Sequence, residues 1–365
     1  MKVGILFRNE SGGGVTKFLT NLILEMSKRK DIDLYVFTDE TKTKDIFPKI
    51  KIIYIPKTNL LIWDYIKLPI HIQKERLEVV IFPKDIIPPI MHFFKIKKVV
   101  ISHDLGYFIK SSGYYPLKDT LYRKIFMNYS LRNADRIIAV SKNTKSEILN
   151  YFSIPQKKIE IIYEGVEKRY KKKNNPSFLD KIRQKYNLNR TFIFYSGSIS
   201  PRKNLFRLIK AFEKIQEKTN CELVIAGNKM WNNKKEMEII RKNSKIKILG
   251  FVPEEDLVAL YNLAEVYVYP SLYEGFGLPI LEAQACGCPV ITSNVSSMPE
   301  VAGKGAVLVN PHSVNEIADA MEKVLKDKKL RDKLIKEGYK NVKRFSWEKC
   351  ARETLKLCEE VYNEK

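Results

Sequence analysis

The feature that most constrains the fold of this 365-residue chain is an alternation of short apolar runs with longer amphipathic segments. Short apolar runs bounded by polar turns are typical of buried strands, and longer periodic segments are typical of helices. In the first half, the predicted strands are residues 2–7, 34–38, 52–55, 79–82, 99–102, 136–140 and 159–162. Helical patterns lie between several of them, for example at residues 15–30, 117–134 and 142–151. Strands that alternate with helices favour a mainly parallel sheet with helices on both faces.

A charged segment at residues 167–176 interrupts this alternation and is interpreted as a linker, followed by a short predicted helix at 178–186. A second series of elements then begins. Its predicted strands are residues 191–196, 222–226, 246–249, 266–269, 290–292 and 306–309. Its predicted helices are residues 204–218, 254–264, 279–286, 313–325 and 329–344, and a last amphipathic helix follows Ser346. We predict two α/β domains, 1–175 and 176–345, and a C-terminal helix at 346–365. The cleft between the domains is the expected ligand site, because ligands bind at the carboxyl ends of parallel strands.

The composition indicates a globular chain, since 44% of the residues are hydrophobic. We find no uncharged apolar run near the roughly 18 residues that a membrane-spanning helix needs. The apolar core of residues 1–8 is too short for a signal peptide and is interpreted as the first strand. The five cysteines, at positions 221, 286, 288, 350 and 358, lack zinc-type pairing. Their odd number and scatter favour reduced thiols, and we expect a cytoplasmic protein.

The formal net charge of +23 has two interpretations. The abundance of lysine, isoleucine and asparagine is partly explained by an AT-biased genome. The functional interpretation is an anionic partner, namely nucleotide phosphates, an acidic membrane surface or nucleic acid.

The segment from Glu274 to Glu282 contains two carboxylates eight positions apart, with a Gly-x-Gly loop and a helix start between them. Pro279 suits a first helical position and Gly287 a helix end. In a strand–glycine loop–helix arrangement, the backbone N–H groups at the helix N-terminus point at the loop. This suits the binding of a phosphate in the loop. A carboxylate beside a phosphate would be repelled, so we expect both glutamates to accept hydrogen bonds from hydroxyls. A nucleotide sugar carries hydroxyls on both sides of its diphosphate.

A second phosphate signal lies at residues 197–204, Gly-Ser-Ile-Ser-Pro-Arg-Lys-Asn, between a predicted strand and a predicted helix. Arg202 and Lys203 are electrostatically misplaced at a helix N-terminus unless an anion binds there. Arginine grips phosphate oxygens as a fork, and lysine acts as a point charge. The alternative is that both are solvated residues of a lysine-rich protein.

These two motifs together resemble the donor-binding half of glycosyltransferase family 4, whose members have the GT-B fold and are retaining. Residues 249–257, Leu-Gly-Phe-Val-Pro-Glu-Glu-Asp-Leu, and 345–349, Phe-Ser-Trp-Glu-Lys, resemble further family segments. The resemblance covers the whole chain but is specific only from about residue 190 onward. It implies two Rossmann-like domains whose parallel sheets face a central cleft, with the C-terminal helix crossing back to the N-terminal domain.

The resemblance also implies roles for individual residues. Glu282 would bind the ribose diol, Glu274 and the backbone of residues 276–278 would contact the sugar and diphosphate, and Arg202 and Lys203 would neutralise the leaving group. Ser198 stands where many relatives carry arginine, so this chain departs from the family pattern at that contact with the diphosphate. The predicted donor-binding residues are Gly13, Gly14, Ser198, Asn228, Phe251, Val252, Gly275, Phe276, Gly277, Leu278 and Glu282. Among them, Asn228, Phe251 and Val252 would frame the base.

In the first half, the resemblance places the loop of residues 12–14 near the donor and points His103 at the sugar. The predicted catalytic residues are His103, Arg202, Lys203 and Glu274. The adjacent Asp104 either orients the imidazole or meets the acceptor. The alternative for the glycine loop is that it only makes a tight turn. The alternative for His103 is a purely structural role.

No convincing metal site is present, and we predict no cofactor besides the nucleotide-sugar co-substrate. Asp31 and Asp33 match the spelling of a metal-binding D-x-D motif but precede a strand in the first half, so we interpret them as surface turn residues. Cationic side chains and helix termini can do the electrostatic work of a metal on a leaving group.

Two segments of the first half, residues 57–78 and 91–98, mix basic residues with large apolar ones. Such segments bind anionic membrane surfaces, and the alternative is that they are core helices with lysine-rich outer faces.

The resulting functional hypothesis is a metal-independent, retaining glycosyltransferase. It would move a hexose of the mannose, rhamnose, glucose or N-acetylglucosamine class from a nucleotide sugar to a glycan or lipid-linked acceptor in surface polysaccharide synthesis. It would act in the cytoplasm, either free or bound peripherally to the cytosolic face of a membrane. Two alternatives are a nucleotide-sugar 2-epimerase and a nucleic-acid-binding protein driven by charge, although the chain has no recognised nucleic-acid-binding module.

Overall fold

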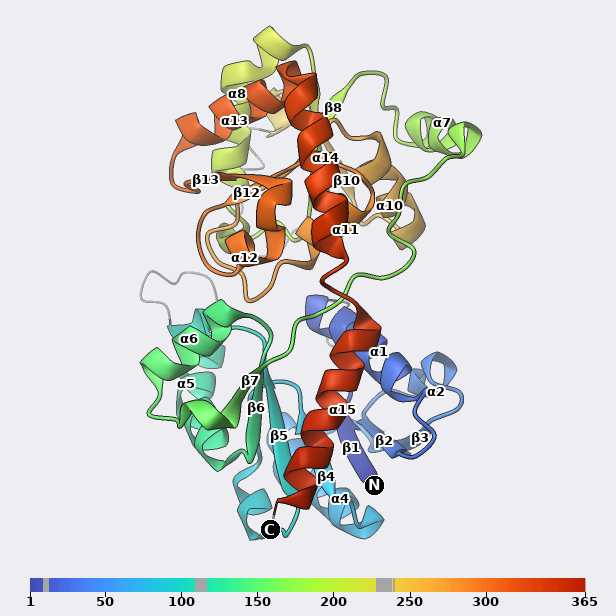
Figure 1. Cartoon of the computed structure of the whole chain (residues 1–365), viewed down its shortest axis with the longest axis vertical. Coiled ribbons are helices and arrows are strands. Elements are labelled where there is room, and N and C mark those ends of the chain that lie inside the picture. Colours follow the sequence, from blue (N-terminus) through green and yellow to red (C-terminus); the bar gives the residue numbers. More distant parts are fainter. Residues whose placement is uncertain (9–12, 109–116, 228–237, 239, 365) are drawn as a thin grey trace. The chain divides into compact units, whose positions relative to one another are not determined.

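The computed structural model describes residues 1–8, 13–108, 117–227, 238 and 240–364, and divides them into two compact units (Figure 1). The first unit comprises residues 1–165 and 346–365, and the second comprises residues 166–345. The unit boundary lies after Gly165, ten residues before the predicted domain boundary. The reason is that the charged segment packs on the second unit through the side chain of Asn262. The Nδ2 atom of Asn262 donates to the Lys171 carbonyl (3.1 Å), and its Oδ1 atom accepts from Lys173 N (2.8 Å).

The first unit contains a seven-stranded parallel sheet in the order β3-β2-β1-β4-β5-β6-β7. Its strands are β1 (Lys2–Leu6), β2 (Asp33–Thr38), β3 (Lys51–Tyr54), β4 (Val79–Phe82), β5 (Lys97–Ser102), β6 (Arg136–Ala139) and β7 (Ile159–Ile161). Its α-helices are α1 (Gly14–Met26), α2 (Thr43–Ile46), α3 (Leu60–Ile62), α4 (Leu68–Glu75), α5 (Leu117–Asn133), α6 (Lys142–Tyr151) and α15 (Trp347–Asn363). A π-helical turn, η1 (Trp63–Lys67), joins α3 to α4, and 3-10 turns lie at η2 (Pro89–Phe93), η3 (Gly106–Phe108) and η4 (Gln156–Lys158).

The strand order assigns the helices of the first unit to two faces of its sheet. The chain moves from β1 to β3 in one direction across the sheet and from β3 to β7 in the other. Since parallel crossovers are right-handed, α1 and α2 cover one face, and α3, α4, η2, α5 and α6 cover the other. The C-terminal helix α15 packs on α1 and on β5 and β6, which places it on the first face (Figure 1).

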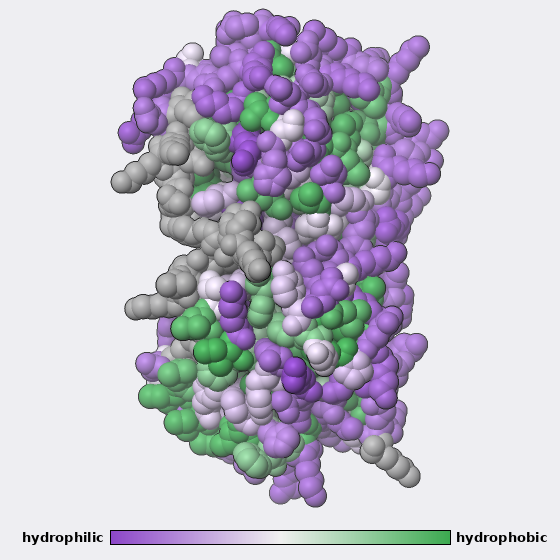
Figure 2. All heavy atoms as spheres, turned by 90° about the vertical axis from the view of Figure 1, so that its left-hand side faces the viewer, coloured by the Kyte–Doolittle hydropathy of each residue, from purple (hydrophilic) through white to green (hydrophobic). Residues whose placement is uncertain are grey.

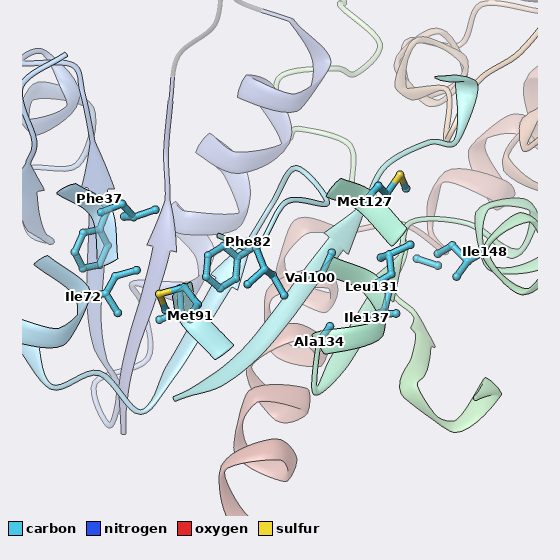
Figure 3. Close-up of a cluster of buried hydrophobic side chains, with 14 of the residues drawn as sticks. Phe37, Ile72, Phe82, Met91, Val100, Met127, Leu131, Ala134, Ile137 and Ile148 are labelled. Atoms are coloured by element: carbon cyan, nitrogen blue, oxygen red, sulfur yellow. The ribbon is translucent and has the colours of Figure 1, made fainter. Parts of the chain in front are cut away.

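The core beneath the second face is continuous (Figure 3). Phe82 of β4 and Met91 of η2 belong to the same buried cluster as Val100 of β5 and Met127 and Leu131 of α5. These side chains are almost fully buried, so each element is fixed on the sheet by the apolar area that it removes from water.

The second unit contains a six-stranded parallel sheet in the order β10-β9-β8-β11-β12-β13. Its strands are β8 (Phe192–Ser196), β9 (Glu222–Ala226), β10 (Ile246–Gly250), β11 (Val266–Tyr269), β12 (Val290–Ser293) and β13 (Ala306–Val309). Its α-helices are α7 (Pro176–Lys185), α8 (Leu205–Thr219), α10 (Glu254–Leu263), α11 (Leu278–Ala285), α12 (Met298–Ala302), α13 (Val314–Lys326) and α14 (Lys328–Val342). The 3-10 turns η5 (Pro201–Lys203) and η6 (Gly303–Gly305) complete it.

The direction of chain travel reverses between the neighbouring strands β8 and β11. From β8 the chain moves outward to β9 and β10, and from β11 it moves outward to β12 and β13. Loops at the carboxyl ends of such a pair diverge to opposite faces, which leaves a binding crevice in open α/β sheets. The loops after β8 and β11 are those that carry the two motifs of the second half.

The structure confirms the predicted fold class, with two parallel-sheet α/β units and a C-terminal helix that returns to the first unit. All five cysteines are free and buried. None of the helices in the described parts of the chain combines the length and apolar character needed to cross a bilayer.

Candidate functional site

The candidate site of the second unit is built where the loops after β8 and β11 meet. Tyr267 and Phe194 pair directly in these neighbouring strands, so the two loops leave the sheet side by side. The first loop ends in η5, which carries Arg202 and Lys203. The second ends at Gly277, whose φ of 109° is reserved for glycine and turns the chain into α11.

Glu274 is the centre of a buried charge cluster in these loops. Its Oε2 lies 2.8 Å from Arg202 Nη1, and its Oε1 lies 2.7 Å from Lys203 Nζ and 2.9 Å from the Tyr269 hydroxyl. Burial opposes ionisation of this carboxyl, but the charges of Arg202 and Lys203 outweigh it and lower its pKa to about 2. The carboxylate is therefore ionised at neutral pH.

Hydrogen bonds to backbone carbonyls fix the two loops relative to each other around this cluster. Arg202 Nη1 also donates to the Tyr273 carbonyl (2.7 Å), and Leu272 N donates to the Arg202 carbonyl (2.9 Å). The Ser297 hydroxyl donates to the carbonyls of Glu274 and Phe276, at 2.9 and 2.7 Å. The cations are thus fixed relative to the turn that starts α11, and neither can swing into solvent without breaking several hydrogen bonds.

This geometry argues against one alternative for the basic pair, that of two solvated surface residues. The side chains of Arg202 and Lys203 are 19% and 11% exposed, which excludes two ordinary solvated surface cations. They lie in a 3-10 turn before α8 and not in the first turn of the helix itself, because Asn204 adopts a left-handed conformation with a φ of 59°. Both cations lie against the same carboxylate, that of Glu274.

Glu282 lies on α11 in a second buried polar network, made of tyrosine hydroxyls. Tyr261 donates to Glu282 Oε2 (3.1 Å), and its hydroxyl lies 2.7 Å from Ser196 Oγ. Ser196 Oγ is in turn 3.1 Å from the Tyr267 hydroxyl. Burial raises the pKa of both tyrosines well above the ordinary value, so they remain neutral donors.

Sequence reasoning missed these tyrosines, although a signal for them existed. Tyr267 and Tyr269 alternate in the apolar strand β11, and a buried tyrosine usually places its hydroxyl on a polar partner. Two tyrosines in a strand next to a predicted ligand loop therefore indicated polar partners nearby.

Gly227 and the predicted donor-binding residues Ser198, Phe251 and Val252 lie at the carboxyl ends of β9, β8 and β10. Gly227, with a φ of 149°, packs so closely on the Gly197 carbonyl that a Cβ there would lie 1.8 Å from the oxygen. Phe251 follows β10 and is 73% exposed, whereas Val252 is buried. Ser198 accepts a hydrogen bond from the Tyr195 hydroxyl through its carbonyl (3.1 Å). The predicted residue Asn228 lies outside the described residues.

The remaining predicted residues of the second unit belong to the turn into α11. Gly275 and Gly277 flank Phe276, which is buried against Phe345 with ring centroids 5.7 Å apart. Leu278 is the first residue of α11, so the helix begins one position before the predicted Pro279.

In the first unit, His103 follows β5 and lies against two groups that sequence reasoning did not connect with it. Its Nδ1 is 3.5 Å from Glu164 Oε1, and its ring meets Phe18 edge-on at 4.7 Å. Its Nε2 is buried and has no hydrogen-bond partner within the described part of the chain. Glu164 is itself buried and follows β7, so both groups come from carboxyl ends of the first sheet.

Asp104 and the glycine loop have simpler local roles. Asp104 Oδ1 accepts from Gly106 N at 2.9 Å, which shapes the turn into η3. Gly13 and Gly14 are exposed at the start of α1, and a Cβ at either position would meet nothing within 4 Å. Gly12 lies outside the described residues.

A buried carboxyl that sequence reasoning missed follows β4. Asp85 is 3% exposed and has a left-handed φ of 58°, and its Oδ1 has no hydrogen-bond partner among the residues that the structure describes. Burial raises its pKa to about 6, against the opposing charge of Arg123. Its position just after a strand, at the edge where ligands bind, was the available signal.

Within the described residues, no group of three or more His, Cys, Asp or Glu side chains is arranged to hold a metal ion. Asp31 lies exposed in a turn and is ion-paired with Arg29, as predicted, whereas Asp33 is the first residue of β2 and not a turn residue.

Comparisons with known proteins agree with this architecture. Residues 12–169 match the model of Glycosyltransferase Family 4, and residues 179–341 match that of Glycosyl transferases group 1. The O-antigen chain mannosyltransferase B of Escherichia coli is 34% identical over 265 residues, which are 71% of this chain and 69% of that protein. The serotype-specific mannosyltransferase WbdA of Escherichia coli is 32% identical over 69% of this chain but only 32% of its own length.

Among solved structures, Anabaena HepE in complex with UDP superimposes with a TM-score of 0.80 over 99% of this chain and 100% of that one. Its sequence identity of 18% makes this a likeness of fold, and that fold is GT-B. The two family matches meet between residues 169 and 179, close to the observed unit boundary. The alignment with mannosyltransferase B covers 71% of this chain, so it includes parts of both units. The chain is therefore a glycosyltransferase that belongs to family 4 and has the GT-B fold.

Proposed function

We propose that this glycosyltransferase moves a hexose from a nucleotide sugar to a glycan or lipid-linked acceptor, with retention of configuration and without a metal ion. The observation that carries the proposal is the cluster in which Glu274 fixes Arg202 and Lys203 at the switch point of the second sheet. Two relatives named as O-antigen or serotype-specific mannosyltransferases favour mannose among the hexoses, and a surface polysaccharide as the product.

Departure of the nucleoside diphosphate is the step that the cluster would assist. Negative charge accumulates on the diphosphate as the glycosidic bond breaks, and preorganised cations stabilise it most effectively where water is scarce. Arg202 and Lys203 are largely buried, and Glu274 and the Tyr273 carbonyl hold Arg202 in place before any ligand binds. We propose that these two cations stabilise the diphosphate as it leaves.

The engagement of Glu274 supports a mechanism without a carboxylate nucleophile. A nucleophilic carboxylate needs an oxygen that can attack the sugar, but both oxygens of Glu274 are held by cations at 2.7 and 2.8 Å. These cations also withdraw charge from it. Attack of the acceptor on the face from which the diphosphate departs fits this arrangement, and the anomeric configuration of the product, read by NMR, tests it.

Around the diphosphate, we propose that Glu282 accepts from the ribose hydroxyls and that Phe251 stacks on the base. Glu282 is oriented by Tyr261, and Phe251 is a large exposed aromatic residue at the carboxyl end of the same sheet. Contacts of Gly13, Gly14 and His103 with the donor sugar, and of Asp104 with the acceptor, remain predictions. Membrane association on the cytosolic side would bring a lipid-linked acceptor to the enzyme.

The test is titration of the protein with a panel of UDP, GDP and dTDP sugars by calorimetry, followed by turnover with the donor that binds. Lys203→Ala and Glu282→Ala should each lower donor affinity or turnover at least about tenfold, since each removes a charged contact that contributes about 1.5–3 kcal/mol. Lys214→Ala, on the exposed side of α8, is the matched control. Unchanged turnover in both site variants would refute the assignment. Formation of an epimer from the donor alone would favour the epimerase instead.

A further inference from the structure

The first unit carries a concentration of exposed apolar side chains that its own fold does not use. Among the described residues, twelve leucine, isoleucine and phenylalanine side chains are strongly exposed, and eight of them lie in three neighbouring segments of this unit. Phe93 is the extreme case, at 82% exposure. The eight are Leu61, Ile62, Ile66, Ile70, Ile90, Phe93, Leu121 and Ile125, which we call the apolar face.

The three segments lie on one side of the sheet and touch one another. Handedness places α3, η1, α4, η2 and α5 on the face opposite α1 and α15. Tyr65 of η1 packs edge-on against Phe126 of α5 with centroids 5.7 Å apart, and the Tyr129 hydroxyl of α5 donates to the Pro89 carbonyl of η2 (3.1 Å). Ile72 of α4 and Met91 of η2 share the buried cluster beneath (Figure 3).

The helix that runs from α3 to α4 shows why burial within the unit does not account for these residues. Its inner side, with Trp63, Leu68 and Ile72, is fully buried on the sheet. A surface helix normally presents polar residues on its other side. Here the outer side presents Ile62, Ile66 and Ile70, spaced four residues apart, so both sides are apolar. The alternative of an ordinary core helix with a lysine-rich outer face is therefore excluded for this segment.

The charges around the apolar face are mostly positive. Residues 57–78, 89–98 and 117–133 contain eleven lysines and arginines and four acidic residues. Three of the acidic residues are already paired, Asp64 with Arg8 (3.2 Å), Glu75 with Lys51 (2.7 Å) and Glu78 with the backbone N of Lys2 (2.7 Å). Figure 2 shows hydrophobic residues beside hydrophilic ones on the surface of the first unit.

We propose that the apolar face docks on the surface of an anionic phospholipid bilayer. Large apolar side chains flanked by lysine and arginine suit the boundary between acyl chains and acidic headgroups, because the former bury apolar area and the latter meet phosphate. The complementary charge favours this partner over a neutral bilayer and over a second, equally basic copy of this chain. The inference deepens the proposed function, since a lipid-linked acceptor would lie at such a surface, and it rests on that function only for its biological purpose.

Sedimentation of the full chain with vesicles tests this surface. Vesicles of equimolar phosphatidylglycerol and phosphatidylcholine should bind the protein at about 0.05 M salt, and binding should weaken several-fold at about 0.5 M. Ile66→Gln together with Phe93→Gln should weaken it by at least about tenfold. The matched control is Leu24→Gln with Ile46→Gln, which changes two exposed apolar residues of α1 and α2 on the opposite face of the same sheet. All four positions are exposed, so thermal melting should show that each double variant is folded.

A second variant examines the charges separately from the apolar residues. Lys95→Glu with Lys124→Glu should also weaken binding, and the remaining binding should lose most of its salt dependence. The inference is overturned if the wild type does not bind anionic vesicles at low salt, or if the Ile66/Phe93 variant binds like the Leu24/Ile46 control. It is also overturned if the wild type is a dimer in lipid-free solution that the Ile66/Phe93 change dissociates. Donor titration distinguishes the two proposals, because the apolar-face variants should bind the nucleotide sugar like the wild type.

Discussion

Replacement of Glu274 by glutamine tests whether the charge cluster holds the second unit together. The side chain keeps its size and loses its charge, so Arg202 and Lys203 would both lose their ion pair with the Glu274 carboxylate. A carboxyl pKa that falls from its ordinary 4.5 to about 2 on folding corresponds to about 3 kcal/mol of stabilisation at neutral pH. For a unit of this size, a loss of about 3 kcal/mol lowers the melting temperature by about 6–12 °C.

The pH dependence gives this prediction a second, independent readout. Because the folded-state pKa of Glu274 is lower than the unfolded one, its stabilisation is present above about pH 4.5 and is lost as the pH falls towards 2. The glutamine variant lacks this stabilisation at every pH. The difference in unfolding free energy between the wild type and the variant should therefore be full at about pH 7 and should shrink towards about pH 3.

Urea denaturation and calorimetry measure both readouts, and inorganic diphosphate supplies a third. The anion should raise the melting temperature of Glu274→Gln more than that of the wild type, because it replaces the lost counter-ion. Glu213→Gln is the matched control, since Glu213 forms an exposed ion pair with Lys210 on α8 and should matter by less than about 1 kcal/mol. A Glu274→Gln protein as stable as this control at neutral pH would refute the reasoning.

Three further predictions follow from other parts of the structure. Burial raises the folded-state pKa of Asp85 to about 6, so its ionisation above that pH opposes folding. In urea denaturation, Asp85→Asn should therefore stabilise the protein by up to about 3 kcal/mol at about pH 8 and by little at about pH 4. Tyr261→Phe should cost about 1–3 kcal/mol, since it removes a buried hydrogen bond to the Glu282 carboxylate, whereas Tyr54→Phe, at an exposed position of β3, should cost almost nothing. Phe251→Ala should leave the unfolding free energy within about 0.5 kcal/mol of wild type yet lower nucleotide affinity at least about fivefold by calorimetry, because an exposed phenylalanine contributes to ligand stacking and not to the core.

Local patterns were enough to predict the sheet-forming elements of this chain. Strand β11 and the turn into α11 illustrate the reason, because a buried strand is an apolar run and the turn requires a glycine with a positive φ at Gly277. Both properties belong to a few adjacent residues. The same holds for the Ser346 side chain, which accepts from Lys349 N (3.1 Å) as the N-cap of α15.

The start of α8 shows where local patterns fail. The sequence predicts a helix from Asn204, but Asn204 is left-handed and Nδ2 of its side chain donates to the carbonyls of Pro270 (2.9 Å) and Pro311 (2.7 Å). Those partners are 66 and 107 positions away in the sequence. The contacts are buried, so satisfying them outweighs one residue of helix, and no pattern near Asn204 reports them.

The site shows the same limit for charges. The sequence patterns predict the strands but not their order in the sheet. Arg202, Lys203 and Glu274 can share one site only if β8 and β11 are neighbours, and the structure shows that they are. What the sequence did not provide is the partner of each charge. A glutamate beside a phosphate loop was expected to face hydroxyls, because the repulsion from the phosphate was considered and the attraction of two nearby cations was not.

The hydroxyl-accepting role and the cation-holding role of Glu274 are nevertheless compatible. A carboxylate has about four acceptor positions. Hydrogen bonds from Arg202, Lys203 and Tyr269 use three of them, and the Ser271 hydroxyl also faces the carboxylate, so a sugar hydroxyl would compete with Ser271 and would not displace a cation. Without ligand, two buried cations would repel each other, and the carboxylate makes their burial tolerable. With a diphosphate bound, the same carboxylate limits the net attraction, so that the site holds the diphosphate firmly enough to stabilise its departure and weakly enough to release it.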